Sequence, residues 1–310
     1  MSASFTLLEE QAHCSQHAFY MNGCEDCQCA EDYKDHSTKL EKNFSKGVVT
    51  IGTHPLVIEP QNPSPKAQLI TQQMARMLAV FFSGAAKSAA VAAGKKAKEF
   101  TKIETTDEEK IALAAYLAIQ WDEIVDSMTT SLMAAYLVGA EEALQQLGMV
   151  SQDINDAASK AAVEYANNRA AEMIGKKYVD EKLVESPSAK YVIANTTKDD
   201  LLDVVTQASQ DDLSITEMME RIKMAGTFSD LRSQFIAKNE RAVAQSVGHI
   251  SMWKASGRIK LVNVVLSDAH NVYDLCDEHS SNGPYTLENC PIIPAHPYCA
   301  CKVQVIELMV

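Results

Sequence analysis

The C-terminal part of the chain contains two pairs of side chains that are suited to bind zinc. Two residues separate the ligands in each pair: Cys276 and His279 form the first, and His296 and Cys299 the second. Zinc takes four tetrahedral ligands, and thiolate and imidazole both suit it. Because one turn can place each pair on one side of an ion, the spacing predicts a closed site. Cys301 could replace Cys299, and the spacing does not choose between them.

A second group of cysteines and histidines lies near the start of the chain. It also contains two pairs of ligands separated by two residues, so it predicts another tetrahedral set. The predicted ligands are Cys14, His17, Cys24 and Cys27, with His13, Cys29 and His36 as substitutes. A bound ion would order a segment with few apolar residues, and we expect the segment to dock on another protein. The alternative is a segment whose thiols bind nothing.

The cysteines belong to these two groups, and none lies between residues 30 and 275. Their number is even, so disulfides are the alternative interpretation. The first residues, from Met1 to Phe5, lack the basic start and the apolar run of a secretion signal. Since disulfides are rare in proteins that are not exported, we expect reduced thiols that bind metal. Cys290 is expected to be a spare thiol outside the site.

The composition favours a helical globular protein. The chain has 310 residues, which suggests about two domains, and only 6% of them are aromatic. Alanine is frequent, which favours long helices. The formal net charge of −13 excludes DNA binding through the overall field of the molecule. The stretch from Met77 to Gly94 contains Lys87 and many small residues, so no membrane span is predicted.

One basic stretch contrasts with this acidic composition. It consists of Lys87, Lys95, Lys96, Lys98 and Lys102. Lysine is favourable near the C-terminus of a helix, so a solvated helix face is the simpler interpretation. The alternative is contact with DNA phosphates or with an acidic protein surface, and such binding should weaken steeply with salt.

The pattern of apolar residues predicts a mainly α protein with three regions. Residues 1–65 form an arm with the first Cys/His group and a proline-rich linker, residues 66–235 form a helical domain, and residues 236–310 form a small α+β module. A capping box from Thr106 to Glu109 predicts the start of one long helix that ends near Gly148. Further helix starts are predicted at Ser151, Thr197 and Ser214.

The last helix is predicted from Phe228 to Ala255, with Gly257 as its end. Two strands follow, around residues 259–266 and 303–308, and the Cys/His loop lies between them. The simplest structure is a β-ribbon that one zinc ion holds closed. Glu240 and Arg241 are expected to be a surface or structural pair on the last helix, and Trp253 is expected to fill the junction with the ribbon.

Several motifs follow one another between residues 236 and 303. They are Ala237-Lys-Asn-Glu240-Arg241-Ala242, then Trp253, Asp268 and Asp274 ahead of Cys276, then Gly283-Pro-Tyr285, and Pro294-Ala-His296-Pro-Tyr-Cys299-Ala-Cys301. In this order they resemble the C-terminal module of the phage head morphogenesis family, the minor head proteins similar to protein F of phage Mu and to the minor head protein of phage SPP1. The His-Pro-x-Cys-x-Cys ending is the most specific motif. The resemblance covers less than a quarter of the chain.

The resemblance implies a minor structural component of a virion. Such proteins are made in the host cytoplasm and enter the assembling capsid in a few copies, in its interior or at the portal vertex. Some affect the delivery or retention of DNA. The implied partners are the portal protein, the major capsid protein, packaged DNA and further copies of the chain.

Two residues depart from the pattern of the family. His279 stands where the family usually has the second cysteine of Cys-x-x-Cys, and histidine remains an acceptable zinc ligand. Ala300 stands where the family usually has an arginine. A contact that this arginine makes with a partner would therefore be missing here.

An enzymatic alternative comes from the same loop. A metal-dependent hydrolase or nuclease could use the side chains that crowd it, which are Asp268, His270, Asp274, Cys276 and His279. A catalytic zinc keeps an open position for water. Since four strong ligands are available, a closed structural ion is favoured, and the chain is not expected to be an enzyme. His249 and His270 are expected to be packing or surface residues.

Overall fold

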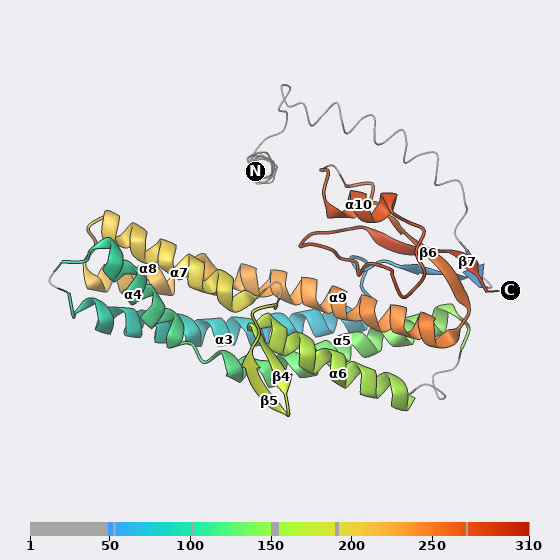
Figure 1. Ribbon diagram of the computed structural model, residues 1–310, viewed down its shortest axis with the longest axis horizontal. Coiled ribbons are helices and arrows are strands. Elements are labelled where there is room, and N and C mark those ends of the chain that lie inside the picture. The colour runs from blue at the N-terminus through green and yellow to red at the C-terminus, as the bar shows by residue number, and fades with distance from the viewer. Residues whose placement is uncertain are drawn as a thin grey trace, which may run out of the picture.

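The computed structural model describes residues 49–51, 54–100, 102–149, 155–189, 192–270 and 272–309. Over these residues the chain forms an elongated helical body with a small sheet at one end (Figure 1). Most of the described residues are helical, which confirms the predicted mainly α class. The predicted ligands of the first Cys/His group, Cys14, His17, Cys24 and Cys27, lie outside the described residues.

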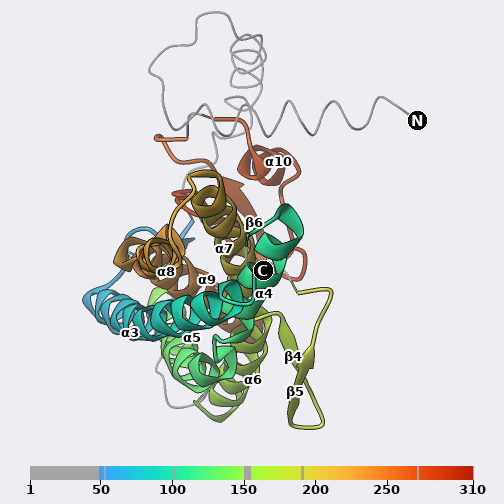
Figure 2. The ribbon, with the colours of Figure 1, turned by 90° about the vertical axis from the view of Figure 1, so that its left-hand side faces the viewer.

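The helices of the body are α3 (Pro65–Ala97), α4 (Thr105–Leu117), α5 (Val125–Gln146), α6 (Asn155–Met173), α7 (Ile193–Gln210), α8 (Ile215–Lys223) and α9 (Asp230–Ser256). The three helices α3, α5 and α9 lie side by side, and α6 packs on α5 (Figures 1 and 2). The shorter helices α4, α7 and α8 cover the end that is far from the sheet.

Apolar side chains at helical spacing hold the body together. On α3 the side chains of Met74, Leu78 and Phe82 are fully buried, and alanines continue this face toward the C-terminus of the helix. Small side chains let neighbouring helices approach closely, which explains why an alanine-rich chain with few aromatic residues can still form a continuous core. The helix begins at Ser64, whose hydroxyl accepts a hydrogen bond from the amide of Ala67.

The long helix that was predicted after Thr106 is wrong in its start and in its continuity. Glu104 and Asp107 form the capping box instead, and the carboxylate of Asp107 accepts a hydrogen bond from the amide of Glu104. The helix then stops at Leu117. A 3₁₀ turn, η2 (Trp121–Ile124), separates α4 from α5 and buries Trp121 in the core. Burial of this indole redirects the chain, and the helical period of the sequence does not reveal it.

Other predicted helix ends have mixed outcomes. The capping box of Ser214 and Glu217 is confirmed at the start of α8, and Gly257 ends α9 with φ of 63°. The start predicted at Thr197 is wrong, because Thr197 is buried inside α7 and its hydroxyl donates to the carbonyl oxygen of Ile193. The helix predicted from Ser151 begins at Asn155.

The sheet at the other end has three strands in the order β3 (Val57–Ile58), β7 (Lys302–Leu308) and β6 (Ile259–Val265). Strands β6 and β7 confirm the two predicted strands, and they pair antiparallel. The short helix α10 (Leu275–Ser281) lies in the loop between them. Two hairpins complete the described strands: β1 (Thr50–Ile51) with β2 (His54–Pro55), and β4 (Lys176–Val179) with β5 (Lys182–Glu185). Neither hairpin was predicted.

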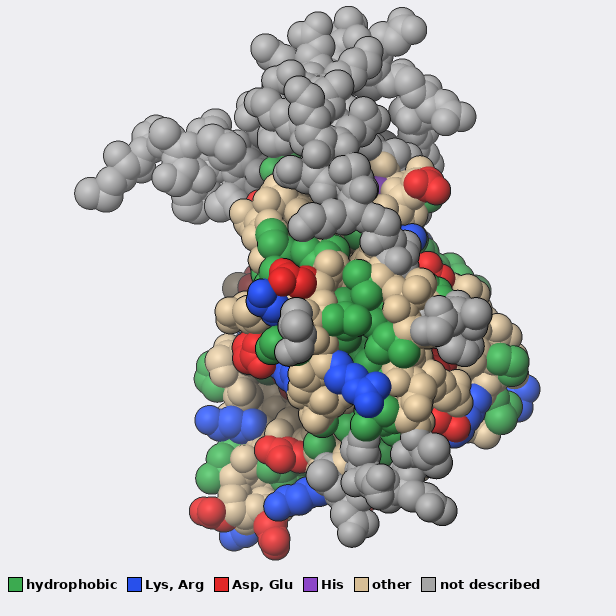
Figure 3. All heavy atoms as spheres, turned by 90° about the vertical axis from the view of Figure 1, so that its right-hand side faces the viewer, with side chains coloured by type: hydrophobic (Ala, Val, Ile, Leu, Met, Phe, Trp, Pro, Cys, Tyr) green, Lys and Arg blue, Asp and Glu red, His purple; other side chains and the backbone are tan. Residues whose placement is uncertain are grey.

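The three predicted regions interlock. The boundary predicted after residue 235 falls inside α9, which packs along α5 and α3 as one continuous helix. Strand β3 belongs to the predicted N-terminal arm, but it pairs with β7, with Ile58 opposite Val303. The C-terminal module therefore shares its core with the helical body, and Trp253 on α9 is fully buried at the junction as expected. At this end, apolar side chains lie among separate acidic and basic ones (Figure 3).

A row of polar side chains is buried along α9. Glu240 forms a bidentate ion pair with Arg169 of α6, with N–O distances of 2.8 Å. Arg241 donates to the carbonyl oxygen of Pro60 at 2.8 Å. Both residues are structural, which was one of the two roles expected from the sequence. They do not pair with each other, because each contacts a different part of the chain. Buried charges are tolerated only when they are paired, so these contacts tie α6 and the β3 segment to α9.

Two glycines allow the backbones of α5 and α9 to come into direct contact. A Cβ atom at Gly139 of α5 would overlap the carbonyl oxygen of Gln245 on α9, and one at Gly248 of α9 would overlap the carbonyl oxygen of Tyr136 on α5. The contacts are reciprocal and involve backbone atoms, which cannot move aside as a flexible side chain can. The α5–α9 crossing therefore requires glycine at both positions.

Helix α3 also bears on the prediction that the chain has no membrane span. Among the described helices it is the one long and apolar enough to cross a bilayer, and 44% of its most apolar stretch is buried inside the helical body. A core helix has the same composition, so this property alone does not indicate a membrane protein.

We predict that Gly139→Ala lowers the free energy of unfolding by roughly 1–3 kcal/mol or more, because the added methyl group forces α5 and α9 apart. The matched control is Gly84→Ala on α3, where a Cβ atom meets nothing within 4 Å. This control should raise the stability by about 0.5–1 kcal/mol, since alanine is the better helix former. Denaturant unfolding of both variants measures the difference, and equal effects would contradict the assignment.

We also predict that His249 makes the fold sensitive to acid. Burial against Trp253 and Gln146 lowers the pKa of His249 to about 3. The unfolded chain takes up this proton near pH 6.5, whereas the folded chain does so only near pH 3. Stability should therefore fall by up to about 5 kcal/mol as the pH drops through this window. His249→Gln should flatten the pH dependence, and His279→Gln, at a partly exposed position, should not.

Candidate metal centre

The start of α10 fixes the first sulfur of the site. The carboxylate of Asp274 accepts a hydrogen bond from the amide of Cys276 at 2.7 Å, and that of Asp277 accepts from the amide of Asp274 at 2.8 Å. These two carboxylates cap the helix. Cys276 consequently lies in the first helical turn, where its side chain is fully buried and faces the loop that leads into β7.

Three sulfur atoms converge at this point. The Sγ atoms of Cys276, Cys299 and Cys301 all lie within 4.8 Å of one another, and those of Cys276 and Cys299 are 3.4 Å apart. All three are buried free thiols. Thiolates that bind one zinc ion at about 2.3 Å lie about 3.8 Å apart at tetrahedral angles. The observed spacing therefore fits a shared ion, and it exceeds the roughly 2 Å of a disulfide.

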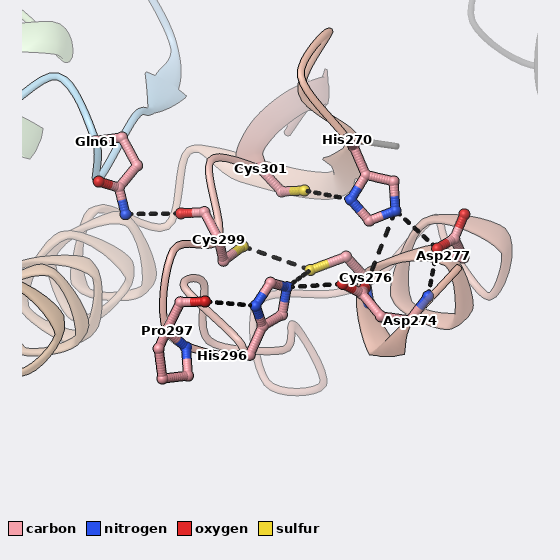
Figure 4. A network of polar contacts seen from close by, with 9 residues as sticks. All are labelled: Gln61, His270, Asp274, Cys276, Asp277, His296, Pro297, Cys299 and Cys301. Carbon is pink, nitrogen blue, oxygen red and sulfur yellow. Dashed lines mark hydrogen bonds and ion pairs between the residues drawn. The ribbon is translucent and has the colours of Figure 1, made fainter. Parts of the chain in front are cut away.

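Two imidazole rings flank the sulfur atoms (Figure 4). The Nε2 atom of His296 lies 3.3 Å from Sγ of Cys276 and 3.0 Å from Oδ2 of Asp274. The Nδ1 atom of His270 lies 4.0 Å from Sγ of Cys301, and its Nε2 lies 2.8 Å from Oδ2 of Asp277. The described residues therefore offer three sulfur donors that lie together, with His296 beside Cys276 and His270 beside Cys301.

The close approach of the thiols changes their proton affinity. Hydrogen bonds from Cys276 and Cys301 lower the pKa of Cys299, because they stabilise its thiolate. The interaction with Cys299 in turn raises the pKa of Cys276. The hydrogen bond with Cys299 also raises the pKa of His296 to about 9. The cluster therefore stabilises one thiolate and disfavours further ones. A dication that replaced the thiol protons would neutralise the negative charge of these additional thiolates.

The structure brings most of the predicted C-terminal ligands together. Cys276, His296, Cys299 and Cys301 meet in one cluster, so both cysteines between which the sequence did not choose are present. His279 does not join them: among the described residues, the groups that could hold a metal do not include it. It lies one helical turn after Cys276 and is partly exposed. A helix, rather than the expected ribbon turn, separates these two side chains.

Cys290 stays outside the cluster, as expected. Its side chain is buried, its Sγ lies 3.4 Å from the carbonyl oxygen of Pro291, and burial raises the pKa of its thiol to about 12. It is therefore a useful reference for the other cysteines.

The predicted lysine patch lies at the end of α3 that is far from the cluster (Figure 1). Lys87, Lys95, Lys98 and Lys102 are exposed, whereas Lys96 pairs with Glu99 at 2.6 Å. The acidic first turn of α4 lies close by, and its Asp107 pairs with Lys110. The positive charge of this patch is therefore partly balanced.

Two contributions to the site escaped the prediction. Asp277 caps α10 and holds His270, although the sequence offered a signal in the form of an acidic residue three positions after Asp274. His270 was expected to be a packing or surface residue, or part of an enzymatic loop. Its approach to Cys301 depends on the pairing of β6 with β7, which local spacing does not reveal.

No family model matches the chain, and no curated protein or solved structure matches it either.

The arrangement is chemically suited to hold an ion in a closed shell. Three sulfurs and one imidazole fill a tetrahedron and leave no position for a reactive water molecule. Cavities of about 250 and 370 Å³ lie at the outer edge of β6 and beside the β4–β5 hairpin, and neither is lined by a residue of the cluster. Neither cavity therefore opens onto the sulfur cluster.

We predict that Cys276→Ser abolishes stoichiometric zinc binding and lowers the free energy of unfolding of zinc-loaded protein by several kcal/mol, since zinc binding contributes folding energy of order 10 kcal/mol in small domains. Cys290→Ser is the matched control, because it removes a buried thiol of the same module outside the cluster. Metal analysis and thermal unfolding check both variants. Retention of one zinc ion by the Cys276 variant would contradict the assignment.

Proposed function

We propose that this chain is a minor structural protein in the head of a tailed bacteriophage, and that zinc locks its C-terminal module. The observation that supports the zinc site is the convergence of Cys276 with Cys299 and Cys301. The phage assignment is supported by the sequence motifs. The most specific of these motifs, the His-Pro-x-Cys-x-Cys ending, also supplies two of these three sulfurs. The proposed ligand set is the three cysteines with one of the two adjacent imidazoles.

The proposed role is mechanical. Helix α3 has 33 residues and is thus about 50 Å long, and the helices packed along it make a stiff body. The ion would join α10 to the start of β7 and so fix the loop of residues 266–301, which connects two strands of one sheet. A rigid body with a locked end is suited to join two components of a capsid, for which the portal protein and the major capsid protein are the proposed partners.

The hydrolase or nuclease alternative lacks a comparable observation. Two carboxylates in this loop, Asp274 and Asp277, both cap α10 and contact histidines. They would have to leave these contacts to activate a water molecule. We therefore propose a structural rather than a catalytic ion.

We predict that phage particles assembled with Cys276→Ala contain less of this protein than wild-type particles, because the unlocked module no longer docks. Particles with Cys290→Ala should contain the normal amount. Quantitative mass spectrometry of purified particles measures the copy number, and a map of the portal vertex shows the position of the protein. Absence of wild-type protein from the particles would refute the proposed function.

The first Cys/His group is proposed to bind a second ion through Cys14, His17, Cys24 and Cys27. The full chain should then hold two zinc ions, and deletion of residues 1–40 should leave one. A single ion in the full chain that survives the deletion would refute this second site and leave the C-terminal one in place.

A further inference from the structure

The orientation of His270 is set by a buried carboxylate. Its side chain is 7% exposed and that of Asp277 is 5% exposed, and Nε2 of the ring lies 2.8 Å from Oδ2 of the carboxylate. A carboxylate accepts hydrogen bonds, so Nε2 carries a proton in this contact. In a neutral ring the lone pair is then on Nδ1, and this atom faces Sγ of Cys301 at 4.0 Å (Figure 4).

This geometry fits a metal ligand. A sulfur atom at about 2.3 Å and a nitrogen atom at about 2.0 Å from one tetrahedral ion lie about 3.5 Å apart. The observed 4.0 Å from Cys301 exceeds that value by about half an ångström. His270 does not lie within 4.8 Å of all three sulfur atoms, so its ring would move toward Cys276 and Cys299 when the ion binds. Histidines that bind metal also commonly donate their second N–H to a carboxylate, which orients the ring and raises its basicity. Asp277 and His270 form such a pair.

His296 is arranged differently, although it is close to the sulfur atoms. Its Nδ1 lies 2.8 Å from the carbonyl oxygen of Pro297, and its Nε2 lies 3.0 Å from Oδ2 of Asp274. Both nitrogens therefore face oxygen acceptors, and a ring that donates to both has no lone pair for an ion. Its side chain is 34% exposed, so it lies at the rim of the cluster. The same Nε2 can donate to the sulfur of Cys276.

We propose that His270, through Nδ1, is the nitrogen ligand that completes the set of Cys276, Cys299 and Cys301, and that Asp277 is its positioning residue. This inference rests on the proposed zinc site and names its fourth ligand, in place of the predicted His279 and His296. His296 and Asp274 then form an ion pair at the rim of the cluster.

The two imidazoles would bind through different ring nitrogens, which makes the inference testable by nuclear magnetic resonance. Long-range proton–nitrogen correlation of the full, zinc-loaded chain with labelled histidine distinguishes a metal-bound nitrogen from a protonated one. His270→Gln and His296→Gln assign the signals. The expected result is zinc on Nδ1 and a proton on Nε2 of His270. Zinc on Nε2 of His296 would overturn the inference and leave the zinc site itself intact.

Competition with a chelator gives an independent measurement. Asp277→Asn should weaken zinc binding roughly 10–100-fold, as expected when the carboxylate behind a metal-bound histidine is neutralised. His270→Gln should weaken it more. His279→Gln should leave the affinity unchanged, and His296→Gln should weaken it less than His270→Gln does, because His296 only donates to the sulfur of Cys276. An equal loss in His296→Gln and His270→Gln would contradict the assignment.

A third readout covers the case in which His270→Gln fails to fold. His270→Cys supplies a thiolate near the same position, and cobalt bound to it should show stronger sulfur-to-metal charge transfer than cobalt bound to the wild type. Unchanged charge transfer would overturn the role of His270. Absence of any bound ion in the wild type would instead refute the proposed function on which this inference rests.

Discussion

The backbone contact between α5 and α9 is the constraint on which the rest of the molecule depends. Gly139 and Gly248 let the two helices meet without side chains between them, and α9 then runs through Gly257 into β6. The direction of the sheet is consequently determined by the helix crossing. Close packing is only weakly adjustable, so the helical body and the sheet form one structural unit although they have separate clusters of core residues.

Polar contacts along α5 and α9 determine how the segment that carries β3 is aligned on these helices. Arg241 reaches the carbonyl oxygen of Pro60, and Gln146 of α5 donates to the carbonyl oxygen of Val57 and contacts His249. A buried donor or acceptor that loses its partner costs more than a formed hydrogen bond contributes. The segment that carries β3 is therefore held in one register on α5 and α9. The sulfur cluster lies in the same module, where the pairing of β6 and β7 sets the distance between its parts.

The sequence predicts the features that depend on nearby residues. The cap at Ser214, the end of α9 at Gly257 and the two strands around the Cys/His loop follow from short patterns and are confirmed. The spacing also predicted that Cys276 meets one of Cys299 and Cys301, and in the structure both of these cysteines lie beside it. The expected zinc ribbon remains a proposal, since a short helix occupies part of this loop.

The features that the sequence does not predict depend on contacts between distant residues. His279 has the correct spacing from Cys276, but a helical turn moves it away from the sulfur atoms, and spacing alone cannot distinguish a turn from a helix of two turns. Strand β3 contains only two residues and is separated by more than two hundred residues from its partner, so no local pattern marks it. The motif at Thr106 predicted the cap of α4, whereas Glu104 and Asp107 form it. The break between α4 and α5 accompanies the burial of Trp121, which the helical period of the sequence does not show.

The antiparallel pairing of β3 with β7 determines how the molecule responds to pulling. Val57 lies opposite Gln304 and Ile58 lies opposite Val303, so the chain enters β3 and leaves β7 at the same end of the sheet. Tension applied through both flanking segments would load these hydrogen bonds one after another, as in a zipper, instead of shearing them together. The sheet should then peel open at low force while the helices stay packed, and single-molecule stretching would reveal this as a small extension before the main unfolding event.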